Sequence, residues 1–290
     1  MSTLTATPQS PGTPGTPGTA PAAPAARPAY RVTGRRVLAS EWAKLWSLRS
    51  TWITLGLGLL FLVAFGVIAA SHYKSSLDSG RHLDHDFAGA TAVSLSLFGT
   101  NFAQLALGVL GVLVTAGEYS TGMIRSSLAA VPRRLPVLWS KAAVFGVIAL
   151  VVGTVGAFAA FLVGGQVVSG TPAAMGLGHA GVVRSLLGAG LYLGLVGVIG
   201  TALGALLRSV AGGISVLVAS LMLVPGLVSL LPTSWRGDID PYLPSNAGES
   251  VFALTHDSTS LSPSAGLLVF LAWAALALAG AAYRLLRSDV

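Results

Sequence analysis

The chain has 290 residues, of which 53% are hydrophobic and only 9% are charged, and its formal net charge is +7. A soluble domain carries roughly 25% charged residues, so this chain has too few to cover a folded surface in water. The composition therefore argues against cytosolic enzymes, nucleic-acid-binding proteins and extended disordered proteins, and it predicts an all-α polytopic membrane protein. Because the chain has no cysteine, disulfides, thiolate metal sites and cysteine nucleophiles are excluded.

Residues 1–29 form a segment rich in Pro, Gly, Thr and Ala, in which the triplet PGT occurs three times between positions 11 and 19. Such a composition cannot bury a hydrophobic core. The segment has neither the basic start nor the apolar stretch of a signal peptide. We expect a disordered cytoplasmic tail, followed by one transmembrane domain at 30–290.

Residues 31–50 predict a basic amphipathic helix that lies in the headgroup plane next to the first span. Its apolar face holds Leu38, Trp42, Leu45 and Trp46, and its polar face holds Arg36, Ser40, Lys44 and Ser47. The candidate residues of this interfacial helix are Glu41, Trp42, Lys44, Trp46 and Arg49. The alternative is an amphipathic helix packed against a soluble core.

Six apolar runs are long enough to cross a bilayer, which takes about 20 residues. They lie at approximately 52–71, 87–116, 137–168, 185–207, 210–231 and 265–286. The fourth and fifth runs are separated only by Arg208 and Ser209, which predicts a tight turn. A stripe of glycines with four-residue spacing, including Gly190, Gly194, Gly200 and Gly204, follows the fourth run and suits close helix packing within the protomer or, less favoured, dimerisation.

The distribution of basic residues predicts the orientation. With the N-terminus in the cytoplasm, the inner segments carry 13 basic and 3 acidic residues, and the outer segments carry 4 basic and 7 acidic residues. Both termini are therefore expected in the cytoplasm. The basic excess orients the spans and gives no reason to expect nucleic acid as a partner.

The loop between the second and third spans, at 118–136, is the most informative cytoplasmic segment. Thr121 can cap a short helix that runs to about Ala130 and stops before Pro132. This helix would carry an apolar stripe of Met123, Ile124, Leu128 and Val131, with Arg125 beside it. Two interpretations stay open at this point: a docking element for a partner protein, and an ordinary loop with stop-transfer arginines.

Three segments resemble the actinobacterial type-2 permeases of ABC transporters, which are the membrane subunits of many exporters. These segments are Ser40–Leu45 with Leu48–Trp52, Gly117–Arg134 with Lys141, and Tyr242–Gly248 (YLPSNAG). With the six-span plan, the resemblance covers about residues 31 to 287. It implies a permease subunit in a bacterial cell membrane that moves a hydrophobic or amphipathic substrate.

The resemblance also implies a coupling helix at about 120–130 that seats in a separate ABC ATPase subunit. The residues of this ATPase-coupling loop would be Glu118, Gly122, Met123, Ile124, Arg125, Leu128, Pro132, Arg133 and Arg134. Glu118 would pair with a basic residue of the partner or with Arg125, or it would simply be a solvated helix end. Six spans are half of the usual set, which implies a second permease copy or a paralogue.

No G-x-x-x-x-G-K-[ST] motif occurs in this sequence. We therefore expect no cofactor on this chain, with ATP and Mg²⁺ bound by the partner ATPase, and no catalytic or metal-binding residue. Asn101 and Gln104 lie one turn apart in the second span and either line a substrate path or join helices. No span has an acidic or basic residue near its middle, which argues against ion-coupled transport.

Two other classes of function remain open. The first is a polytopic anchor or assembly protein that needs no ATPase. The second, less favoured, is an intramembrane metalloenzyme that uses the polar loop after the first span. That loop holds His82, Asp84, His85 and Asp86, with His72 before it, but their spacing fits no standard zinc site.

Overall fold

The structure is a computed structural model that describes residues 33–80, 89–124, 134–255 and 259–287. Every regular element in these ranges is a helix. The tail predicted at 1–29 lies outside the described residues.

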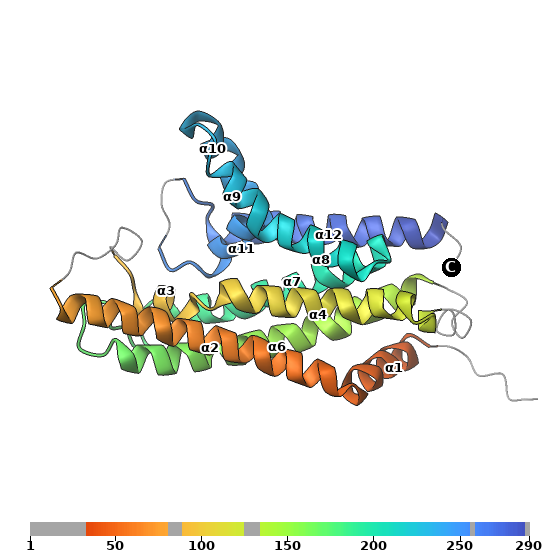
Figure 1. Cartoon of the computed structure of the whole chain (residues 1–290), viewed down its shortest axis with the longest axis horizontal. Coiled ribbons are helices and arrows are strands. Elements are labelled where there is room, and N and C mark those ends of the chain that lie inside the picture. Colours follow the sequence, from red (N-terminus) through yellow and green to blue (C-terminus); the bar gives the residue numbers. More distant parts are fainter. Residues whose placement is uncertain (1–32, 81–88, 125–133, 256–258, 288–290) are drawn as a thin grey trace, which may run out of the picture. The chain divides into compact units, whose positions relative to one another are not determined.

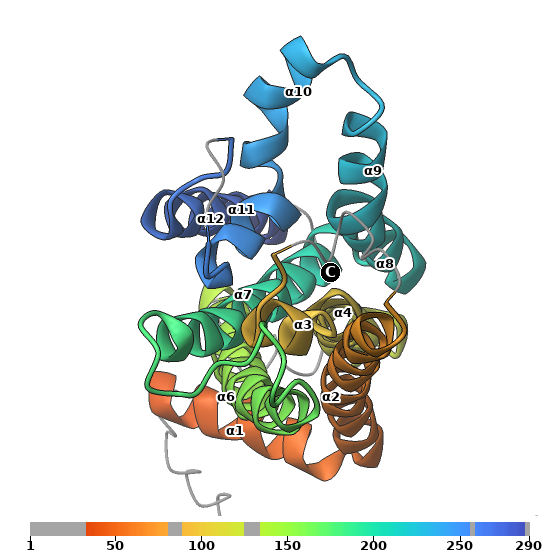
Figure 2. The same ribbon diagram turned by 90° about the vertical axis from the view of Figure 1, so that its left-hand side faces the viewer.

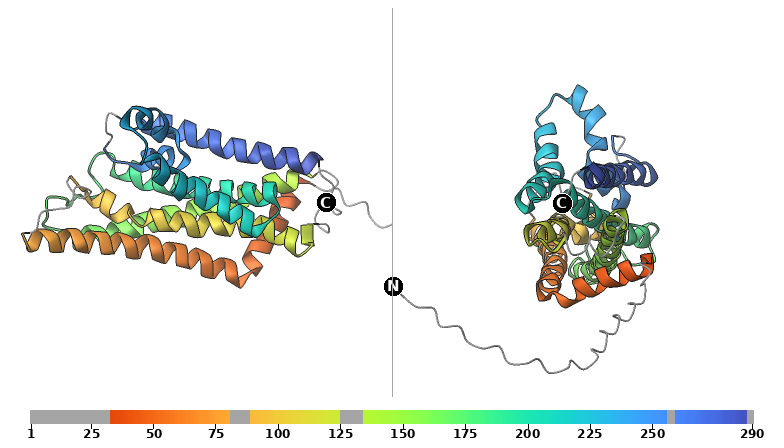
Figure 3. Two further views of the ribbon diagram at one scale, coloured as in Figure 1. Left: turned by 45° about the horizontal axis from the view of Figure 1, so that its top comes forward. Right: turned by 90° about the vertical axis from the view of Figure 1, so that its right-hand side faces the viewer.

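Six helical segments of the described chain are long and apolar enough to cross a membrane, as the sequence predicts. They are α2 (Arg49–Asp78), α3 and α4 (Ala92–Leu97 and Thr100–Ser120), α6 (Leu135–Val167), α7 (Val182–Leu207), α8 to α9 (Val210–Val218 and Val224–Val228) and α12 (Pro263–Arg287). Figure 1 and the left panel of Figure 3 show these long helices running roughly side by side. The chain is therefore an all-α protein with the architecture of a multi-pass membrane protein.

Helix α7 is the core of this arrangement, and it packs against α4, α6, α11 and α12 (Figure 2). Its glycines allow the backbones to approach closely. A Cβ at Gly190 would overlap Thr154 of α6, and a Cβ at Gly200 would overlap the carbonyl of Gly108 in α4. The glycine stripe is thus covered inside the chain, as the interpretation of packing within one protomer requires, and it is not a free dimerisation face.

The second span is interrupted, whereas the sequence predicts one continuous run. Helix α3 begins with a capping box, in which the backbone N–H of Ser94 donates to the Thr91 hydroxyl at 3.1 Å and the backbone N–H of Thr91 donates to the Ser94 hydroxyl at 2.9 Å. The break before α4 falls at Gly99, where a Cβ would overlap the carbonyl of Leu62 in α2. Close packing against α2 therefore decides where this span is broken.

The fifth span changes its helical type in the middle. Between α8 and α9 the chain forms a π-helix, η2 (Ala219–Leu223), just before Pro225. Proline has no N–H and its ring crowds the carbonyl four residues earlier, and a wider turn removes this conflict. The turn before the span is as tight as predicted: Arg208 adopts φ +53° after α7, and the Ser209 hydroxyl accepts a hydrogen bond from the N–H of Gly212 at 3.2 Å.

The Pro-rich segment before the last span forms short helices. It contains α10 (Thr233–Ile239), the short 3₁₀ helix η3 (Asp240–Tyr242) and α11 (Pro244–Phe252). Helix α11 packs against α7 and α12. Prolines stand at the first turns of η3 and α11, where a missing N–H costs nothing.

Large apolar side chains remain exposed along the spanning helices. Ile53 and Leu60 of α2, Val155 of α6, and Leu268 and Leu276 of α12 are each more than half exposed. An apolar surface of this extent suits hydrocarbon rather than water.

Candidate functional site

Helix α1 (Gly34–Ser47) lies beside α6 and is turned differently from the predicted orientation (Figure 2). Its buried residues are Val37, Glu41 and Leu45, whereas Trp42 and Trp46 are 45% and 57% exposed. The Trp residues therefore point away from the protein, as interfacial anchors do. Glu41 is 2% exposed, so it does not belong to a solvated polar face.

Burial of Glu41 is explained by a cluster of four charged residues, which we call the ion cluster: Glu41, Lys44, Glu118 and Lys141. The Lys141 ammonium donates to Glu41 at 2.6 Å and to Glu118 at 2.9 Å. Lys44 donates to the same two carboxylates at 2.7 and 3.2 Å. Two ammonium groups thus compensate two carboxylates, which is what a buried charge needs.

The ion cluster joins three helices. Glu41 and Lys44 are one turn apart on α1, Glu118 is near the end of α4, and Lys141 is in the second turn of α6. Lys141 and Glu118 are 3% and 8% exposed. The Glu118 carboxylate is therefore neither a solvated helix end nor directed at a partner protein, because it is bound inside the chain.

The cluster holds the two residues of α1 in their charged forms. Burial alone raises the pKa of the Glu41 carboxyl, but the nearby Lys141 and Lys44 outweigh it and leave the pKa below its ordinary value. Burial lowers the pKa of Lys44, but its contacts with Glu41 and Glu118 raise the net pKa above its ordinary value. The stability that the charged Glu41 contributes is therefore lost as pH falls through its lowered pKa, and the contribution of the charged Lys44 is lost as pH rises through its raised pKa.

The predicted coupling loop leaves the protein directly beside the ion cluster. Helix α4 ends at Ser120, and the Thr121 hydroxyl donates back to the carbonyl of Gly117 at 2.9 Å, so Thr121 terminates α4. Gly122 turns the chain with φ +74°, after which Met123 is 48% exposed and Ile124 is buried. Arg125, Leu128, Pro132 and Arg133, which the sequence assigns to this loop, lie outside the described residues.

Two arginines hold other helix ends near the loop. Arg134 donates to the carbonyl of Leu285 near the end of α12 at 3.3 Å. The guanidinium of Arg208, at the end of α7, lies 5.2 Å from the centre of the Tyr119 ring in α4. The end of the bundle that carries α1, which we call the α1 end, is thus tied together by charged side chains.

The two polar residues of the second span have different surroundings. Gln104 is buried, and the Tyr192 hydroxyl of α7 donates a short hydrogen bond to its side-chain oxygen. Gln104 thus joins two spans, as the helix-packing interpretation requires. Asn101 is exposed and lines a pocket between α3 and α11.

Most of the histidines considered for a metal site lie outside the described residues. His82 and His85 lie outside the described residues, and His72 is in α2. Among the residues that the structure describes, no three His, Cys, Asp or Glu side chains form a group that could hold a metal ion.

The sequence analysis missed Lys141 as a partner of Glu41 and Glu118. Lys141 and Glu41 are 100 residues apart in the sequence, so no local spacing pattern could have paired them. One signal was available: Lys141 is a charge inside an apolar run, and such a charge needs an opposite charge from another helix.

Comparison with protein-family models and with curated protein sequences finds no match to this chain.

Proposed function

We propose that this protein is the membrane-spanning permease subunit of an ATP-driven ABC exporter, located in a bacterial cell membrane. The proposal rests on the resemblance of three segments to type-2 permeases and on the six spanning helices. Because the sequence contains no phosphate-binding loop, a separate ABC ATPase subunit would supply the energy, and a second copy or a paralogue would complete the permease.

One observation carries the proposal furthest: the ion cluster braces the helices from which the predicted coupling loop emerges. Glu118 is two residues from the end of α4, and Lys141 is six residues into α6. The direct bond between them, at 2.9 Å, spans the base of the loop, and Glu41 ties α1 to the same lysine. A force on the loop would therefore move α4, α6 and α1 together.

The proposed cycle follows from this bracing. Closure of two ATPase subunits would press on the loop at 118–136 and tilt α4 and α6. Both helices pack against the glycine-rich α7, so their motion would reach the core directly. Rigid motion of packed helices is a common way to switch between two states.

The test is co-purification of the tagged chain with an ABC ATPase encoded beside its gene, followed by ATPase measurement in lipid. Met123→Asp places a charge on the exposed side chain at the start of the loop and should abolish co-purification. The control is Leu177→Asp, because Leu177 is similarly exposed, at 41%, but lies between α6 and α7 at the other end of the bundle.

The Leu177 variant should bind the ATPase normally. Glu118→Gln should leave the ATPase bound but reduce the stimulation of its activity, because the brace under the loop is weakened. Absence of any associated ATPase, or equal loss of binding in both Asp variants, would contradict the proposal.

A further inference from the structure

A polar group with no role in the proposed coupling lies at the opposite end of the bundle, which we call the α11 end (Figure 1). There one face of α11 is fixed by close packing. A Cβ at Gly248 would overlap the Tyr192 ring of α7, and the carbonyl of Val251 lies against Gly188 of α7. Because Gly248 and Val251 face α7, the helical period directs Glu249 to the other side of α11.

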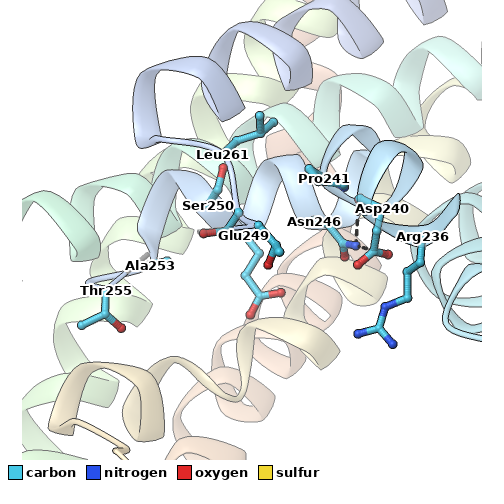
Figure 4. A pocket seen from close by; sticks show the side chains of 12 residues that line it. Arg236, Asp240, Pro241, Asn246, Glu249, Ser250, Ala253, Thr255 and Leu261 are labelled. Atoms are coloured by element: carbon cyan, nitrogen blue, oxygen red, sulfur yellow. Dashed lines mark hydrogen bonds between the residues drawn. The ribbon is translucent and has the colours of Figure 1, made fainter. Parts of the chain in front are cut away.

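Glu249 lies where two pockets meet. The first pocket has a volume of about 540 Å³ and is lined by polar groups of α10, η3, α11 and the segment at 259–261 (Figure 4). The second has a volume of about 420 Å³ and opens between α11 and α3. Glu249, Ala253 and Thr255 line both pockets.

The second pocket is mainly apolar. Its apolar lining consists of Val93, Leu95, Leu97, Phe98, Phe252 and Leu254. The two pockets together therefore offer a polar lobe and an apolar lobe with a carboxylate at their junction.

The Glu249 carboxylate has no partner in the part of the chain that the structure describes, since no hydrogen bond or ion pair reaches it. Its side chain is open to the pockets, yet surrounding protein removes much of its water, and this desolvation raises the pKa of the carboxyl. The neighbouring carboxylate of Asp240 differs, because the Asn246 amide donates to it at 2.8 Å (Figure 4). Arg236 lines the first pocket but forms no ion pair with Glu249.

We propose that these two pockets form a binding site for a cationic amphiphile. Its ammonium or guanidinium group would meet the Glu249 carboxylate, and its hydrocarbon part would lie in the lobe beside α3. A charge-assisted hydrogen bond would compensate the desolvated carboxylate, and burial of hydrocarbon in the second pocket would add the hydrophobic part. A soluble cationic amphiphile and an aminophospholipid headgroup offer the same ammonium chemistry.

This inference deepens the proposed function, because the role of the amphiphile as transported substrate depends on that function. Binding itself needs no ATPase. Failure of the binding test therefore leaves the ATPase co-purification test standing, and failure of co-purification leaves the binding site standing.

The test uses the purified full chain in neutral maltoside micelles and two fluorescent probes with the same alkyl chain, one ending in an ammonium group and one in a hydroxyl. The parent protein should bind the ammonium probe more tightly. Glu249→Gln should weaken that binding about tenfold or more, the effect expected for a lost hydrogen bond to a charged group. It should leave the hydroxyl probe unchanged.

Two further variants test whether the effect depends on the position and on the charge of Glu249. Asp238→Asn removes a carboxylate from exposed α10 outside both pockets and should change neither probe. Glu249→Asp keeps the charge and should keep the preference for the ammonium probe. Equal binding of the two probes by the parent protein, or unchanged ammonium binding in Glu249→Gln, would overturn the inference.

A final arm separates the two sources of the ammonium group. Phosphatidylethanolamine is added to the micelles before titration with the ammonium probe. Competition that disappears in Glu249→Gln would identify a lipid headgroup as an occupant, and lack of competition would identify a soluble amphiphile. Both outcomes support the cationic site, whereas competition that persists unchanged in Glu249→Gln would overturn it.

Discussion

At the scale of single residues, Lys141 is a buried cation that pairs with two carboxylates. It is 3% exposed and serves two carboxylates from two other helices. The two carboxylates that meet its ammonium lie 100 and 23 residues away in the sequence. An intact buried ion pair contributes little net stability, because the cost of removing both charges from water offsets their attraction. Loss of one partner is strongly destabilising, because it leaves an uncompensated buried charge.

We therefore expect Lys141→Met to destabilise the protein by about 3–5 kcal/mol, because Glu41 and Glu118 would lose the buried one of their two shared cations and keep only the partly exposed Lys44. The free energy of unfolding in mixed detergent micelles measures this effect. Lys74→Met is the control, since Lys74 is half-buried near the end of α2 and makes no ion pair with a described residue. Its loss should cost about 1 kcal/mol or less. Equal destabilisation by the two changes would show that losing a lysine from the ion cluster costs no more stability than losing a lysine outside it.

At the scale of elements, the packing of α7 depends on glycine at a few contacts. Small residues allow helices to approach within the bilayer, where the hydrophobic effect does not drive helices together. Gly200 lies against the backbone of Gly108, and Gly204 lies against the carbonyl of Val112, so α4 and α7 touch backbone to backbone. Close backbone contact also sets the break between α3 and α4, where Gly99 lies against α2.

We expect Gly200→Ala to cost about 1–3 kcal/mol of stability, because the added methyl group would overlap the carbonyl of Gly108. Gly165→Ala is the matched control in α6, since a Cβ there meets no atom within 4 Å. Alanine is the better helix former by about 1 kcal/mol, so the control should be neutral or slightly stabilised. Thermal unfolding of the two variants in the same detergent compares them, and a neutral Gly200 variant would contradict the packing described.

At the scale of the whole molecule, the two ends of the bundle are chemically different. The α1 end holds the ion cluster and the start of the predicted coupling loop. The α11 end holds the short helices, the two pockets and Glu249. The sequence predicts that the α1 end faces the cytoplasm, and this polarity is what the permease proposal requires.

The absence of cysteine allows a direct test of that polarity. Single cysteines at Ser47, the last residue of α1, and at Ser79, directly after α2, both replace exposed residues. In intact bacteria, a membrane-impermeant maleimide should label the cysteine at position 79 and should label the one at position 47 only after lysis. The reverse pattern would place the coupling loop on the wrong side and would contradict the permease proposal.

The outline of the fold could be read from the sequence with good accuracy. Apolar runs of about 20 residues and a basic excess on alternate loops are local properties, and six spans followed from them. The tight turn at Arg208 and Ser209 was also readable, because it depends on neighbours in sequence. The spacing of the glycines indicated a close helix contact but not which helices it joins. The interruption at Gly99 and the π-helix before Pro225 were not, since packing against other helices decides them.

The candidate site was readable only in part. The amphipathic character of 34–47 was evident, but the side that faces the protein was not, because Glu41 resembles a surface residue until Lys141 is placed beside it. Glu118 was expected to pair with a partner protein or with Arg125, or to end its helix in solvent, whereas it pairs with Lys44 of α1 and Lys141 of α6. Glu249 gave no signal at all in the sequence, because its importance comes from two pockets that distant segments form.

The local sequence is enough to predict a helical chain, six segments long and apolar enough to cross a membrane, and the positions of the basic loops. Hydrocarbon requires long uncharged helices, and charge bias is a local property. The three-dimensional packing was needed to show which charges are buried together, and that the pocket carboxylate of Glu249 has no partner among the described residues. Helix rotation and packing set those pairings, and they bring together residues up to 100 positions apart.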